Sequence, residues 1–148
     1  MSMRFSFAAV LLILIGCESN DIGTDFIRKY FAMTSSEQII QLGDFSVEEQ
    51  YAIFLYGNQV VHPPAIHLAR PFAEQGAELV PFLKLQLEGA ADEETIRDIV
   101  SVLVEMNYLE LYDFSNDPEL MMLLEEKSNG MRGVWKETTI KMILDIQE

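Results

Sequence analysis

The chain has 148 residues, of which 24 are acidic and 10 basic, and its formal net charge at pH 7 is −14. A surface this acidic excludes nucleic-acid binding and flat adsorption on anionic lipid, since both need basic side chains. The single cysteine excludes an intramolecular disulfide. The acidity itself has two interpretations: a solvated surface that favours solubility, or complementarity to a basic protein partner, which would raise the association rate.

Residues 1–16 have the pattern of a secretory signal peptide. Arg4 is the only charged side chain among them, and an uninterrupted apolar run from Phe7 to Ile15 ends at the small residue Gly16. The run is too short for a comfortable membrane span, which needs about 20 apolar helical residues. Two alternatives stay open at this point: an uncleaved anchor, and an ordinary buried cysteine at the end of the run.

The end of this segment, Leu14-Ile15-Gly16-Cys17, resembles the lipobox of bacterial lipoproteins. The resemblance implies attachment of diacylglycerol to the Cys17 sulfur, cleavage after Gly16 and acylation of the new amino group. Because two or three acyl chains hold a protein stably on a bilayer, it further implies a lipid-anchored protein of the bacterial cell envelope, on the periplasmic or outer-membrane side and not cytoplasmic. Residues 17–23 would then be a short lipidated tether.

A single folded domain is predicted over 24–148, and its first two helical patterns are short. The stretch 24–31 places an acidic residue early and basic residues late, as the helix dipole favours. A brief helix then opens at Ser35 or Ser36, and Gly43 is placed to end it.

The clearest helix start is a capping box, in which Ser46 and Glu49 satisfy each other's backbone amides. It opens a helix over 47–61, which must end at 62–64, because each of the two prolines there disfavours helix in the residue before it. The remaining patterns predict helices over 64–75 (kinked or split at Pro71), 78–88, 93–106, 118–128 and 133–146, with 107–115 as an ordered connection.

Every strong pattern is helical, so the predicted fold class is all-α. The helices come in three consecutive pairs with a period of about 30 to 40 residues, the range of helical-hairpin solenoids. The segment 76–106 is similar to one HEAT repeat, with an apolar first helix, a turn that contains Asp92, and Arg97 near the start of the second helix. The resemblance implies a short HEAT-like array, and a compact helical bundle is the alternative.

Few residues suit catalysis or metal binding. His62 and His67, the only histidines, lie five apart across two prolines, unlike the i, i+4 pair of a metalloprotease helix. We therefore predict no catalytic residue, no metal and no cofactor. The alternative is a small envelope hydrolase that uses carboxylates or the His62/His67 pair, which requires a cleft where a histidine meets buried carboxylates.

Local preferences are violated at one junction. Gly57 weakens a helix interior by about 1 kcal/mol relative to alanine, and the polar Asn58 and Gln59 follow it; His62 precedes two prolines, and Arg70 lies one helix later. Since sites that violate local rules are often functional, we predict these five residues as a contact surface for a protein partner. The alternative is that the glycine only lets a neighbouring helix approach closely.

The predicted function is that of a membrane-anchored envelope lipoprotein with a non-enzymatic, protein-binding role, as an adaptor, an assembly factor or an immunity-type protein. Its partners would be the lipid bilayer, through acylated Cys17, and an unknown protein. That protein would be basic if the acidity of the chain serves complementarity to a partner. Nucleic acid is not an expected partner.

Overall fold

A computed structural model describes residues 24–147, so the predicted signal peptide, Cys17 and the tether lie outside the described residues. This part of the chain forms helices and no strand, which confirms the all-α class. Within it, no helix is both long enough and apolar enough to cross a bilayer. The α-helices are α1 (Thr24–Phe31), α2 (Ser35–Leu42), α3 (Val47–Gln59), α4 (Ala69–Ala73), α5 (Val80–Gly89), α6 (Glu93–Tyr108), α7 (Pro118–Gly130) and α8 (Lys136–Gln147), and the short 3-10 helices are η1 (Ile66–Leu68), η2 (Gly76–Leu79) and η3 (Phe114–Asn116).

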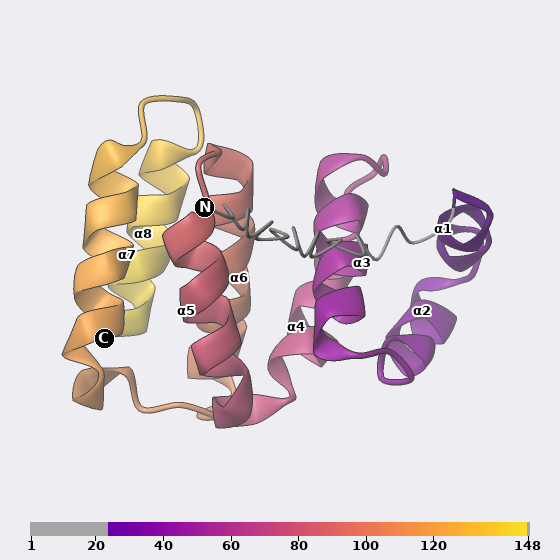
Figure 1. The fold of residues 1–148 in the computed structure, drawn as a ribbon, viewed down its shortest axis with the longest axis horizontal. Helices are drawn as coiled ribbons and strands as arrows, with labels where there is room; N and C mark the ends of the chain where they lie inside the picture. Colours follow the sequence, from indigo (N-terminus) through magenta and orange to yellow (C-terminus); the bar gives the residue numbers. More distant parts are fainter. Residues whose placement is uncertain (1–23, 148) are drawn as a thin grey trace, which may run out of the picture.

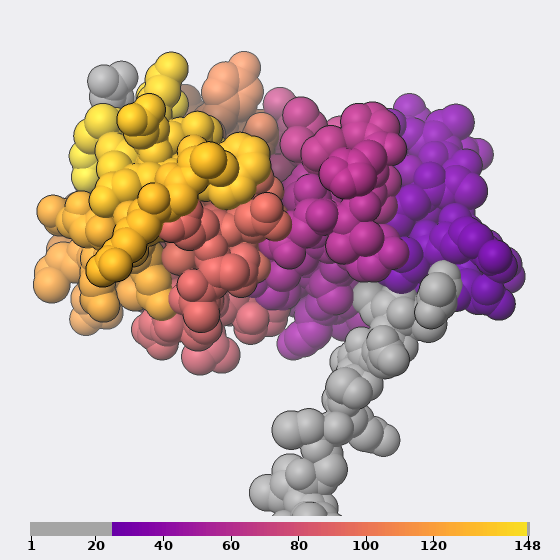
Figure 2. Space-filling view, turned by 90° about the horizontal axis from the view of Figure 1, so that it is seen from above, coloured from indigo at the N-terminus to yellow at the C-terminus, as the bar shows by residue number. Residues whose placement is uncertain are grey.

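The helices follow one another along the long axis of the domain (Figure 1). Consecutive helices pack in pairs, α3 with α4, α5 with α6, and α7 with α8. Neighbouring pairs pack on each other, because α6 contacts both α4 and α8 and α5 contacts α7. The space-filling view shows the same order, with the N-terminal helices at one end and the pair of α7 and α8 at the other (Figure 2).

Helix α6 is the centre of the core. Ile99, Val100, Val102, Leu103 and Met106 are all fully inaccessible to solvent. These residues cover more than one face of the helix, as packing between α4 and α8 requires. Burial of this stripe helps to hold the three helix pairs together, since each fully buried aliphatic side chain contributes about 1.5–3 kcal/mol.

The predicted helix starts at residues 35 and 47 are confirmed, whereas the last helix begins at Lys136 and not at 133. The capping box of Ser46 and Glu49 opens α3 as predicted. Helix α2 begins at Ser35, one of the two predicted starts, and a second capping box that the sequence analysis did not identify, Thr34 with Glu37, precedes it. Thr34 with Glu37 satisfies two backbone amides at once, whereas Gln38, three residues after Ser35, donates to the Met33 carbonyl and pairs with His67.

The predicted helix over 64–75 is shorter and divided. Helical structure begins as η1 rather than at Pro64, and α4 covers only Ala69–Ala73. Pro71 lies in the first turn of α4, where a missing backbone donor costs nothing, so it does not kink the helix. Gly76 ends this region with a φ of +77°, a left-handed conformation that favours glycine.

Asp117 joins three elements at the start of α7. Its Oδ1 accepts from the Leu120 amide at 3.0 Å and lies 3.4 Å from Lys84 Nζ, and its Oδ2 accepts from the Tyr112 hydroxyl at 2.7 Å. Burial raises the pKa of Asp117, but these hydrogen bonds outweigh it and the pKa is lowered. The carboxylate therefore stabilises the fold above its unfolded pKa of about 4, and this contribution is lost as the pH falls through the lower folded pKa.

We expect Asp117→Ala to lower the free energy of unfolding by about 1–2 kcal/mol at pH 7, since it removes a helix cap. The difference in the free energy of unfolding between Asp117→Ala and the wild type should shrink as the pH falls below about 4. Denaturant unfolding at pH 7 and at pH 3 measures both effects. Asp117→Asn is the control, because asparagine caps helices equally well; a difference that grows on acidification would contradict the assignment.

Candidate functional site

A groove runs over α6, between the end of α3 on one side and the start of α8 on the other. It has a volume of about 550 Å³, within the 300–1,000 Å³ typical of ligand sites. The end of α3 and η1 form one wall, α6 forms the floor, and the start of α8 forms the opposite wall. We call it the α6 groove; its lining includes Asn58, Ile66, Glu94, Asp98, Glu105 and Trp135.

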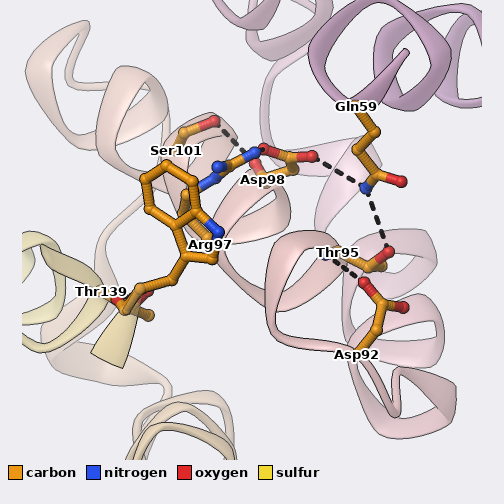
Figure 3. A network of polar contacts seen from close by, with 8 residues as sticks. Gln59, Asp92, Thr95, Arg97, Asp98, Ser101 and Thr139 are labelled. Atoms are coloured by element: carbon orange, nitrogen blue, oxygen red, sulfur yellow. Dashed lines mark hydrogen bonds and ion pairs between the residues drawn. The ribbon is translucent and has the colours of Figure 1, made fainter. Parts of the chain in front are cut away.

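A polar network ties the end of α3 to the floor of the groove (Figure 3). Asp98 is only 2% exposed. Its Oδ2 accepts from Gln59 Nε2 at 3.0 Å, and the same nitrogen donates to Thr95 Oγ1 at 3.2 Å. Its Oδ1 accepts from Arg97 Nε at 3.0 Å and from Arg97 Nη2 at 2.5 Å. Both carboxylate oxygens are therefore engaged.

Burial raises the pKa of Asp98, and the hydrogen bonds from Gln59 and Arg97, together with the guanidinium charge, oppose that rise. Burial destabilises the charged form of Asp98 more than these partners stabilise it, so the pKa stays raised. Because its lone pairs are occupied from two sides, Asp98 links helices and is not a free base.

Arg97 also connects the floor of the groove to the opposite wall. Its guanidinium carbon lies 4.1 Å from the ring centroid of Trp135, in cation–π contact. The carbonyl of Trp135 in turn accepts from Thr139 Oγ1 at 2.8 Å in α8. The positive charge of Arg97 is thus paired with Asp98 and covered by an aromatic ring, so the remaining carboxylates in the lining, Glu94 and Glu105, set the charge of the open space.

Asn58 is the unusual residue of the lining. It is 8% exposed, and its Oδ1 is buried without a hydrogen-bond partner, the single such side-chain atom in the part of the chain that the structure describes. An unpaired buried polar atom costs about 1–3 kcal/mol. Native structures rarely leave such an atom unsatisfied, and this one faces the interior of the fold and not the open space of the groove.

The structure brings together three of the five residues predicted as a contact surface. Asn58, Gln59 and His62 all line the α6 groove. Arg70 is not part of the lining; its Nε lies 3.8 Å from a carboxylate oxygen of the exposed Glu74. Gly57 does not line the groove either, because it is buried at a close helix contact.

Gly57 allows α3 to approach its neighbours. A Cβ at this position would lie 2.9 Å from the Ala65 Cβ and 3.0 Å from the Phe31 ring. We therefore expect Gly57→Ala to lower the free energy of unfolding by about 1–3 kcal/mol, although alanine is the better helix former. Denaturant unfolding tests this, with Gly89→Ala as the control, since a Cβ at Gly89 meets nothing within 4 Å. Equal effects of the two substitutions would show that close packing is not the cause.

The two histidines occupy different places. His62 lines the α6 groove, whereas His67 Nε2 donates to Gln38 Oε1 of α2 at 2.9 Å. Burial lowers the pKa of His67. The structure therefore does not bring the pair to one site. Among residues 24–147, no group of three or more His, Cys, Asp or Glu side chains is placed to hold a metal ion.

The sequence did not reveal the roles of Asp98 and Trp135. The helical pattern places Asp98 on the polar face of its helix, which suggests exposure, and Trp135 reads as part of an apolar stripe. The assignment of Asp98 fails because Gln59, which reaches it, lies 39 residues earlier. Trp135 does pack against the core as its stripe predicts, and only its contact with Arg97 was missed. The adjacent charges Arg97 and Asp98 were the one local signal of a salt bridge.

Comparison of the chain with protein-family models, with curated proteins and with solved structures finds no match. The site is thus defined by its own geometry: a groove with apolar walls, two carboxylates and a neutralised Arg97–Asp98 pair.

Proposed function

We propose that this chain is a lipid-anchored protein of the bacterial cell envelope, whose helical domain binds another protein through the α6 groove. The anchor rests on the lipobox-like Leu14-Ile15-Gly16-Cys17 that follows a signal-peptide pattern. The binding role is non-enzymatic, as adaptor, assembly factor or immunity-type protein. The observation that carries it is the groove itself, which takes its lining from all three helix pairs.

The stacking order supports a short HEAT-like array over a compact bundle. Each helix pair packs on the next, and α6 lies between α4 and α8. In arrays of this kind the repeats together form an extended surface that binds partners. The α6 groove takes its lining from all three pairs, which suits a segment of protein chain better than a compact ligand.

Exposed apolar side chains at the groove support a protein partner as well. Ile66 is 74% exposed and belongs to the lining, and Val134 is exposed next to Trp135. Apolar side chains gathered beside a pocket and flanked by charged groups are typical of protein interfaces.

The anchor is tested by labelling with palmitate in cells. The wild type and Ser19→Ala, a control within the tether, should both take up label and fractionate with membranes. Cys17→Ser should do neither, since the thioether cannot form without the thiol. Uptake of palmitate by Cys17→Ser would refute the lipoprotein assignment.

The binding role is tested by placing a photo-crosslinking amino acid at Ile66 or at Thr138, on opposite walls of the groove. Both positions should yield an adduct with the same protein in cells. Met122 is the control, because it is 69% exposed on α7 and does not line the groove. Adducts that form equally from Met122, or from neither wall, would contradict binding in the groove.

One observation favours a second candidate, a small hydrolase: His62 and the buried Asp98 line the same groove. The purified chain would then turn over chromogenic esters, amides or glycosides, and His62→Gln would abolish that turnover. A rate that is unchanged in His62→Gln would exclude this candidate.

A further inference from the structure

We propose that the surface formed by α1 and the end of α3 docks on the bilayer that holds the lipid anchor. The inference rests on the proposed function, because it names the part of the domain that meets the membrane once acylated Cys17 is inserted. The centre of this surface is a hollow of about 340 Å³, lined by Ile27, Arg28, Phe31, Ala32, Tyr56 and Val61. We call these residues, together with the neighbouring Val60, the α1–α3 face.

The α1–α3 face exposes apolar side chains to solvent. Val60 is 53% exposed and Tyr56 38%, and the Tyr56 ring stacks on that of Phe31 with 5.9 Å between the centroids. The hollow takes its lining from both helices, which belong to the N-terminal half of the domain (Figure 1). Tyrosine is enriched where a bilayer meets water, because its ring is apolar and its hydroxyl polar.

The α1–α3 face also lacks the acidity of the rest of the chain. Of the 148 residues 24 are acidic, yet the stretches 26–36 and 50–73, which together contain the whole face, have no acidic residue. Asp25, just before the first stretch, forms an ion pair with Arg28 at 2.8 Å, and Lys29 is exposed in the same helix. The net charge of the chain opposes adsorption of its surface as a whole on anionic lipid, but this face carries none of the negative charge.

The short distance along the chain from the anchor to α1 keeps this face near the bilayer. Residues 17–23 can span at most about 25 Å even when fully extended, and Ile27 follows Thr24 by less than one helical turn. Helices α7 and α8 lie at the opposite end of the domain (Figure 1). Because a short linker holds an attached domain at about millimolar effective concentration, a surface too weak to bind a membrane alone is enough to orient it.

The size of the α1–α3 face favours a bilayer over a protein as its occupant. A stable protein interface takes about 20–30 residues a side, and the six residues that line the hollow fall far short of that number even with Val60. A lipid interface needs no partner of complementary shape, since it binds in proportion to the apolar area that it buries.

Fluorophores on introduced cysteines test the docking, because the lipid occupies the sulfur of Cys17, the only native cysteine. The full lipidated chain, with Ala32→Cys or Met122→Cys, is labelled and inserted in vesicles of phosphatidylethanolamine and phosphatidylglycerol. Ala32 is exposed on the face, and Met122 is 69% exposed on α7. A nitroxide at the headgroup end of a lipid acyl chain should quench the label at Ala32 about threefold more than that at Met122, since interfacial apolar side chains enter this boundary.

A charge on the face should abolish this difference. In the chain labelled at Ala32, Val60→Asp should reduce quenching to the level seen at Met122, because a carboxylate resists transfer out of water. Leu144→Asp is the matched control, since Leu144 is 54% exposed, almost the same as Val60, but belongs to α8. Neither substitution should change the uptake of palmitate.

Equal quenching at Ala32 and Met122 in a chain that carries palmitate would overturn this inference and leave the proposed function standing. An equal effect of Val60→Asp and Leu144→Asp would do the same. A label at Ala32 whose emission shifts to the blue without quenching by the lipid nitroxide would mean that a protein, either a partner or a second copy, covers the face, and this too would overturn the inference. A wild-type chain that takes up no palmitate would refute the proposed anchor, and the inference would fail with it.

Discussion

Replacement of Phe72 by alanine should lower the free energy of unfolding by about 3–5 kcal/mol. Phe72 is fully buried, and its ring lies 5.9 Å from that of Phe54 and 6.3 Å from that of Tyr51, centroid to centroid. Helix α4 has only five residues, too few to be stable without tertiary packing. The aromatic contact with α3 therefore holds α4 in place. A loss of this size is a large share of the 5–15 kcal/mol typical of a domain.

Denaturant unfolding of the full chain measures the effect, with Leu85→Ala as the control. Leu85 is mostly exposed on α5, so its truncation should change the free energy of unfolding by less than about 0.5 kcal/mol. Phe72→Leu should fall between the two, because it leaves a smaller cavity. A cost below about 1 kcal/mol for Phe72→Ala would mean that the α3–α4 pair does not depend on this ring.

Asp98→Ala should cost about 3 kcal/mol, at the low end of what the loss of one partner costs a buried ion pair. Arg97 would lose its counter-charge while its side chain stays mostly buried. Gln59 would lose the acceptor that ties the end of α3 to α6. The effect on the fold is therefore greater than that of a surface ion pair, and the groove should lose its shape with it.

Asp25→Ala is the matched control for Asp98→Ala. Asp25 forms an ion pair with Arg28 at 2.8 Å, but both side chains are largely exposed, and exposed pairs contribute little to stability. Denaturant unfolding at pH 7 should separate the two variants clearly. Similar losses would show that burial is not what gives the Arg97–Asp98 pair its importance.

The pH dependence of Asp98→Ala should have the opposite sign to that of Asp117→Ala. Because burial raises the folded pKa of Asp98, the folded state binds the proton more tightly than the unfolded state. The contribution of Asp98 is therefore fully present below the unfolded pKa of about 4 and declines as the pH rises through the folded pKa. Unfolding measured from pH 3 to 7 should show the deficit of Asp98→Ala largest at the acidic end.

The sequence by itself determined where most helices begin and end. Ser46 with Glu49 satisfies backbone amides within three residues, so its signal is local and visible in the chain. The structure shows Asp92 and Asp117 capping α6 and α7 over the same short distance. The all-α class follows from the same signals and from the apolar period. The prediction over 64–75 was wrong, because the closely spaced prolines of this segment give competing local signals. The helix found there is short, and only tertiary packing decides where it begins and ends.

Only the tertiary structure decided which polar residues form a site. Asp98 is buried because α4 and α8 cover more of α6 than its apolar face. How helix pairs pack on one another cannot be inferred from the sequence of a single helix. Gln59 reaches Asp98 across 39 positions, and Trp135 covers Arg97 from a third pair. Helix caps act over one turn of chain, so they can be inferred from the spacing of residues. A groove needs side chains from distant segments, so it follows only from how the helices pack.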